Sequence, residues 1–188
     1  RELNQIDLAW STLLNRSDQG SNTTRYNGQA MYRRLIEGSG WFYGGTVDIL
    51  RSNQQNLKLR LTPAAIAGRT LVHTNRSEAF LWAGVDLNRE WFLEPVDNVT
   101  DQTSTEAIIG SSLSIFHFDS TQMDTSLVFY PSLSQAGRYR LDFNNTLYLD
   151  LWGDFYVSFT FYDNFDSQPQ GDTPKNDMGV TTSFGWSV

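Results

Sequence analysis

Alternation of apolar and polar residues with a period of two is the feature of this sequence that most restricts its fold. It is clearest near the C-terminal end, where Leu141 and Phe143 alternate with Arg140, Asp142 and Asn144. Successive side chains of a β-strand point to opposite faces of a sheet, so this pattern indicates strands with one apolar and one polar face. The pattern recurs along the chain and predicts ten strands, at residues 2–15, 23–36, 41–51, 56–72, 77–93, 105–118, 123–131, 137–151, 154–163 and 177–188.

The connections between the predicted strands alternate in length. Short turns are predicted at 37–40, 73–76, 119–122 and 152–153, and longer, more polar connections at 16–22, 52–55, 94–104, 132–136 and 164–176. An even number of strands with short turns on one rim and long loops on the other is typical of outer-membrane barrels. We therefore predict an all-β fold, a single antiparallel up-and-down transmembrane β-barrel of about ten strands, with short periplasmic turns and longer extracellular loops. The alternation fails at 63–68, where a bulge or a short helical turn is predicted.

Composition excludes several other classes of protein. No run of about 18 apolar residues is present, so a membrane-spanning helix is not predicted. The net charge of −7 repels phosphate backbones, so nucleic acid is not an expected partner. The absence of cysteine removes disulfides and thiolate chemistry. No linker divides the 188 residues, so 1–188 is predicted to be one domain, which we interpret as a processed or excised part of a longer precursor because it begins at Arg1.

The two faces of the predicted strands have different expected environments. The polar face carries opposite charges in mid-strand, which a narrow barrel would enclose as a salt-bridged network. The predicted lumen-facing charges are Arg25, Arg33, Asp48, Lys58, Arg60, Glu78, Asp86, Arg138, Arg140, Asp142 and Asp150. The predicted lipid-facing residues are Leu141, Phe143, Leu147, Leu149, Phe155, Val157, Phe159, Phe161 and Phe184.

Aromatic residues lie near the predicted strand ends, where outer-membrane barrels place girdles at the boundary between water and lipid. Those predicted for the periplasmic girdle are Trp41, Trp152 and Trp186, and those for the outer girdle are Trp91, Tyr139 and Tyr162.

Two other classes of function remain open from the residues. A soluble β-barrel could show the same alternation with its apolar face turned inward around an apolar ligand. A lipid-modifying membrane enzyme would need a catalytic histidine, and the only two, His73 and His117, lie near a predicted periplasmic turn and on the predicted outward face. No catalytic residue is therefore predicted.

The acidic segment 163–177 could collect Asp163, Asp166, Asp172 and Asp177 around Ca²⁺. Their spacing does not match a known calcium loop, so a solvated acidic loop is the preferred interpretation. No metal or cofactor is predicted.

The C-terminal third resembles a known bacterial family. The residues that carry the resemblance are the run 125–150, the strand 154–166 with its Tyr-Asp-Asn-Phe-Asp loop entry, and Lys-Asn-Asp-Met-Gly-Val-Thr-Thr-Ser-Phe-Gly-Trp-Ser-Val at 175–188. These segments are similar to domain of unknown function 481, whose members are described as salt-induced outer-membrane proteins. The resemblance covers about residues 70–188 and implies a barrel fold and an outer-membrane location, but it transfers no catalytic residue. Barrel chains commonly end in an aromatic residue, whereas this one ends in Val188.

These observations together predict an integral protein of the bacterial outer membrane, in the cell envelope. The expected role is non-enzymatic: a structural element, a narrow pore or an anchor for an envelope assembly. The expected partners are outer-membrane lipid and other envelope proteins. The lumenal charges are expected to hold the lumen closed or to set a weak ion selectivity.

Overall fold

The computed structural model describes residues 4–15, 23–96, 98–117, 121–151, 155–169, 171 and 173–186. These residues form ten strands, which confirms the predicted number. Their bounds are β1 Asn4–Asn15, β2 Thr23–Leu35, β3 Trp41–Ser52, β4 Leu57–His73, β5 Ser77–Val96, β6 Val99–His117, β7 Thr121–Pro131, β8 Tyr139–Asp150, β9 Phe155–Asp166 and β10 Asn176–Trp186.

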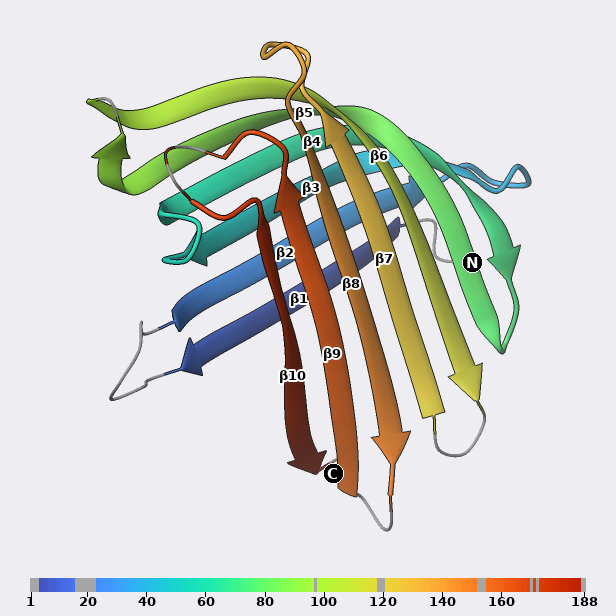
Figure 1. Cartoon of the computed structure of the whole chain (residues 1–188). Coiled ribbons are helices and arrows are strands. Elements are labelled where there is room, and N and C mark those ends of the chain that lie inside the picture. The colour runs from blue at the N-terminus through green and yellow to red at the C-terminus, as the bar shows by residue number, and fades with distance from the viewer. Residues whose placement is uncertain are drawn as a thin grey trace.

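The ten strands form one antiparallel sheet in which every strand pairs with its neighbours in the chain, in the order β1 to β10. The sheet curls until β1–β4 face β7–β10 across a concave interior (Figure 1). Among the residues that the structure describes, β1 pairs only with β2 and β10 only with β9. The sheet is thus an open half-barrel, whereas the alternation had predicted a closed one. Alternation fixes which face of a strand is apolar, but it carries no information about the partner of an edge strand.

The connections lie on two opposite rims. Connections 36–40 and 74–76 and the end of β8 share one rim with the start of β1 and the end of β10, which we name the terminal rim (Figure 1). Connection 53–56 and the described residues between β9 and β10, at 167–169, 171 and 173–175, lie on the opposite rim, which we name the loop rim (Figure 1).

Within the connection predicted at 94–104, residues 94–96 and 99–104 are strand instead of loop. β5 and β6 continue as a long hairpin, and Val96 pairs with Val99. Asn98 has a positive φ of 65°, a conformation that asparagine tolerates in tight turns. Polar residues on both faces suggested a loop, but a hairpin that projects beyond the sheet can be solvated on both faces and still pair its backbone (Figure 1).

The segment 63–68 is also regular strand, contrary to the bulge or helical turn predicted there. Pro63 pairs with Val47 in β3, and the register continues through Ile66 opposite Gly44. Proline cannot donate a backbone hydrogen bond, and the pairing of β4 with β5 omits Pro63 and the preceding Thr62. The proline therefore interrupts one ladder without breaking the strand.

The apolar core of the molecule lies on the concave face. Trp82 of β5 packs against Gly110 of β6, where a Cβ would meet the indole ring at 2.1 Å, so only glycine fits opposite this tryptophan. The remaining members come from β2 to β7, and we name the whole group the apolar cluster: Met31, Phe42, Ile66, Phe80, Trp82, Ile108, Val128 and Tyr130. Its members from β2, β3 and β5 lie toward the terminal rim, whereas Val128 and Tyr130 lie toward the loop-rim end of β7. A second, smaller apolar group near the loop rim consists of Leu50, Leu57 and Phe92.

Candidate functional site in the concave interior

The predicted lumenal charges fall into three groups in the structure. Six are buried: Arg25, Arg33, Arg60, Asp86, Arg138 and Arg140. Asp48, Glu78 and Asp142 are half-buried, and Asp150 is exposed at the end of β8. Lys58 is exposed as well, because it lies at a register shift between Leu57 and Leu59 that takes it out of the alternation. Lys58 therefore does not join the buried charges.

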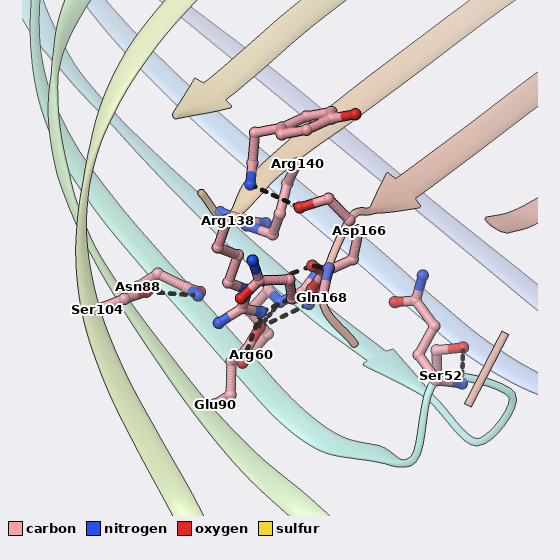
Figure 2. A network of polar contacts seen from close by, with 12 residues as sticks. Ser52, Arg60, Asn88, Glu90, Ser104, Arg138, Arg140, Asp166 and Gln168 are labelled. Carbon is pink, nitrogen blue, oxygen red and sulfur yellow. Dashed lines mark hydrogen bonds and ion pairs between the residues drawn. The ribbon is translucent and has the colours of Figure 1, made fainter. Parts of the chain in front are cut away.

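Four charged residues from different strands meet at the loop rim. The Nη2 atom of Arg138 lies 2.6 Å from Asp166 Oδ2 and 3.1 Å from Glu90 Oε2. Arg60 Nη2 lies 2.6 Å from Glu90 Oε1 and 3.9 Å from Asp166. Figure 2 shows these side chains converging from β4, β5 and β9 and from the segment that leads into β8. Two positive and two negative charges balance, as the burial of ions requires.

A second buried ion pair lies beside this group. Arg140 donates through Nη2 to Glu106 Oε2 at 2.6 Å, and its guanidinium lies 4.4 Å from the centre of the Tyr130 ring. Glu106 is fully buried and also accepts a hydrogen bond from Ser104 Oγ at 3.0 Å. Asn88 in turn donates to Ser104 (Figure 2). We name the whole set the ionic network: Arg60, Asn88, Glu90, Ser104, Glu106, Arg138, Arg140 and Asp166.

A third contact joins the two ends of the sheet. Arg25 of β2 pairs with Asp177 of β10, and Asp177 also accepts a hydrogen bond from Ser52 of β3 at 3.2 Å. The guanidinium of Arg25 lies 4.6 Å from the centre of the Tyr162 ring. Side chains therefore link the edges of the half-barrel across the interior near the loop rim, although the edge strands do not pair.

Arg33 anchors the opposite end of the interior. Its guanidinium lies 3.0 Å from Asp7 of β1 and 3.6 Å from Glu78 of β5, over the Phe80 ring at 4.0 Å. The charge of this arginine is thus compensated at the border of the apolar cluster.

Sequence reasoning missed the acidic partners of these arginines. Glu90 has the same strand parity as Glu78 and Asp86, so extending the alternation along β5 would have found it. Glu106 lies at the start of the predicted strand 105–118, but it was not included among the lumenal charges. The other missed acids that form buried pairs are Asp166 and Asp177.

The acidic segment 163–177 does not gather its carboxylates. Asp166 and Asp177 are bound to arginines, whereas Asp163 lies on the convex face and Asp172 lies outside the described residues. Among the described residues, no three His, Cys, Asp or Glu side chains are placed to hold one metal ion.

The residues predicted to face lipid all lie on the convex face. Phe184, Phe159 and Phe161 are exposed there. Val157 also has the convex-face parity, but its neighbours cover it. The remaining members, Leu141, Phe143, Leu147, Leu149 and Phe155, are half-buried among one another.

Three of the predicted girdle aromatics lie on the convex face. Trp41 is at the terminal-rim end of β3, whereas Trp91 and Tyr139 lie toward the loop rim. Tyr162 is different, because it turns into the interior beneath Arg25. Trp152 and the side chain of Trp186 lie outside the described residues.

A cavity of about 450 Å³ occupies the interior between the two ends of the sheet. It is bordered by β1 and β2 on one side and by β8, β9 and β10 on the other. Polar side chains dominate its lining, among them Asn27, Asp48, Asp142, Asn144 and Tyr162. The space therefore suits a polar or charged occupant better than an apolar one.

Of the two histidines, His73 is exposed at the end of β4 and does not line this cavity. The side chain of His117 lies outside the described residues. Within the described part of the chain, no helix has the length and apolarity to cross a bilayer.

Comparisons with known proteins place the chain in a family. No curated protein and no solved structure matches it. A family model described as "Protein of unknown function, DUF481" matches residues 1–188, the whole chain. This extends the resemblance beyond the C-terminal part to the first strands, and the chain belongs to the DUF481 family.

Proposed function

We propose that this protein is an integral component of the bacterial outer membrane, with its convex face in lipid and its interior closed by side chains. Its role is then structural, or that of an anchor for an envelope assembly, and non-enzymatic. One observation carries the proposal: large apolar side chains are exposed on the outside, while arginines and carboxylates are buried inside.

The exposed apolar residues support a lipid environment. Leu8 is 77 % exposed, Phe184 69 % and Val180 66 %, and similar residues occur on the convex face of the other strands. Exposed apolar surface of this extent is unfavourable in water and marks membrane or protein contacts in soluble proteins. The soluble alternative requires the leucine and phenylalanine face to turn inward around an apolar ligand, and the strands present that face outward.

The ionic network supports a closed interior more than a wide pore. Its charges come from opposite sides of the sheet and form pairs across the interior. Ten strands enclose too little space for a wide aqueous channel once such side chains fill it. We therefore expect small and infrequent conductance in planar bilayers, and a large unselective conductance would contradict the closed interior.

Membrane insertion places a further demand on β1 and β10. Unpaired backbone N–H and C=O groups cannot face hydrocarbon without a cost of several kcal/mol per group. We propose that these two edges pair with each other in the bilayer and complete the wall. The chain has no cysteine, so single cysteines introduced at Leu8 and Val180 would report the approach of the two strands by oxidative cross-linking in membranes.

The first test is heat-modifiability of the protein extracted by detergent from isolated outer membranes. A folded membrane barrel migrates differently on a gel before and after boiling, so we expect two positions. A protein that stays in buffer without detergent and shows one position would contradict the proposal.

Two substitutions on one strand sharpen this test. Val85 lies mid-strand on the convex face of β5, and Leu93 lies on the same face nearer the loop rim. The two variants are Val85→Arg and Leu93→Arg. A charge at the bilayer midplane costs about 2–4 kcal/mol and much less near the interface. We expect Val85→Arg to reduce the folded, unboiled band far more than Leu93→Arg, whereas equal and small effects would favour the soluble alternative.

A further inference from the structure

The cavity in the interior is lined by two carboxylates that form no ion pair among the described residues. Asp48 from β3 and Asp142 from β8 both line it. Within the described part of the chain, neither carboxylate forms an ion pair with an arginine or lysine, because the pairs present involve other acids. These two carboxylates reach the cavity from opposite sides of the curled sheet.

The three arginines that reach the cavity do not balance these acids. Each is paired with an acidic residue that does not line the cavity: Arg25 with Asp177, Arg60 with Glu90, and Arg140 with Glu106. These three guanidinium groups line the cavity as well, but each already has a carboxylate partner, so Asp48 and Asp142 keep no ion-pair partner of their own among the described residues.

A third carboxylate, that of Asp86, lies close to the cavity without lining it. Asp86 of β5 is 2 % exposed, and neither of its carboxylate oxygens has a hydrogen-bond partner among the described residues. It lies on the concave face opposite Ala64, and Ala64 is two positions from Thr62, which lines the cavity. The charges of Glu106, Asp48 and Asp142 disfavour its ionised form, and that of Arg140 favours it. A buried carboxylate without a partner is unfavourable when ionised, so a cation bound nearby would stabilise its charged form.

We propose that the cavity binds a small aliphatic diamine, with one ammonium group at Asp48 and the other at Asp142. Two carboxylates that reach the cavity from different strands, β3 and β8, match the two positive charges of a diamine, and among the described residues no three His, Cys, Asp or Glu side chains are placed to hold one metal ion. The amide oxygens of Asn27 and Asn144 can accept further N–H bonds. Two apolar side chains of the lining, Leu50 and Val128, can contact the methylene stem.

This inference stands apart from the proposed membrane location, since the cavity and its charges are present in either environment. The probe is the diamine putrescine, titrated by calorimetry into the full chain in detergent, or in buffer if the chain proves soluble. The matched controls are n-butylamine, which has one ammonium group, and Mg²⁺.

We expect saturable binding of putrescine, with a dissociation constant at least about tenfold lower than that of n-butylamine. Asp48→Asn and Asp142→Asn should each weaken putrescine binding at least about tenfold, as expected for the loss of one charge-assisted hydrogen bond. Asp150→Asn is the matched control, because this residue is on the same strand as Asp142 but is exposed and does not line the cavity. It should leave binding unchanged.

Several results would overturn the proposal. These are absence of putrescine binding to a chain that passes the folding check, equal binding of putrescine and n-butylamine, tighter binding of Mg²⁺ than of putrescine, or equal weakening by all three variants. Mobility of the unboiled protein on a gel, or far-ultraviolet circular dichroism for a soluble chain, checks folding. If Asp142→Asn fails this check, Asp48→Asn on β3 tests the same site.

Discussion

Two neighbouring groups in the interior are held together by opposite chemistry. In the apolar cluster, rings and branched side chains from β2 to β7 pack against one another. In the ionic network, three arginines join three carboxylates. Apolar packing stabilises in proportion to buried area and tolerates rearrangement, whereas a buried ion is tolerated only with its own partner in place. The apolar cluster should therefore supply stability, and the ionic network should specify which strands face each other.

The largest effect is expected where a single partner of the ionic network is removed. Glu106→Gln leaves the Arg140 guanidinium buried without its carboxylate and should lower the free energy of unfolding by about 3–5 kcal/mol. The double variant Glu106→Leu with Arg140→Met should recover most of this loss, because an apolar pair of similar volume carries no desolvation cost. Urea unfolding in lipid vesicles, followed by tryptophan fluorescence, measures both. An equal loss of stability in the double variant would contradict the view that the unpaired buried charge causes the loss in Glu106→Gln.

A cavity in the apolar cluster should cost somewhat less and should have no rescuing partner. Ile66→Ala removes buried methyl and methylene groups beside Phe42 and should destabilise by about 2–4 kcal/mol. The same urea titration applies. Destabilisation below about 1 kcal/mol would mean that the cluster collapses around the gap and packs less tightly than the structure indicates.

The contact across the interior comes next in size. Asp177→Asn weakens the bond to Arg25 and should cost about 1.5–3 kcal/mol, with faster amide exchange in β10 than in the central strands. Asp163→Asn is the matched control, because Asp163 lies nearby on the convex face of β9. Equal exchange rates in the two variants would show that the side-chain contact does not hold the edge.

The smallest effect is expected at an exposed ion pair. Arg89 and Asp101 approach to 3.5 Å, with side chains 54 % and 43 % exposed. Asp101→Asn should change stability by less than about 0.5 kcal/mol, since exposed pairs are solvated and screened. A loss of several kcal/mol here would remove the distinction between buried and exposed charge on which the other predictions depend.

The strands were predictable from sequence because period two is a local signal. All ten were found, and Arg138 and Arg140, which share a parity in the sequence, are both buried. Part of the hairpin was missed because the segment 101–104 has no apolar face to reveal it, although these residues pair with 88–91 of β5.

The arrangement of the site was less predictable because it depends on contacts between distant strands. Asp166 and Asp177 were interpreted as parts of a solvated acidic loop. Only the curl of the sheet brings them to Arg138 and Arg25, and the local sequence does not reveal that curl. Tyr162 was assigned to the outer girdle from its position near a strand end, although its parity with Asn164 places it on the concave face. The alternation of apolar and polar residues also does not show whether β1 and β10 pair with each other.

Pairing in strict chain order has a consequence for the route by which the protein folds. Each strand can join its predecessor by closing a hairpin, an event on the scale of about 1–10 μs that requires little loop-closure entropy. The contact between Arg25 and Asp177 spans 152 residues and depends on the curl of all the intervening strands. It should therefore form last and break first, so that unfolding begins where the ends of the chain meet while the middle of the sheet is still intact.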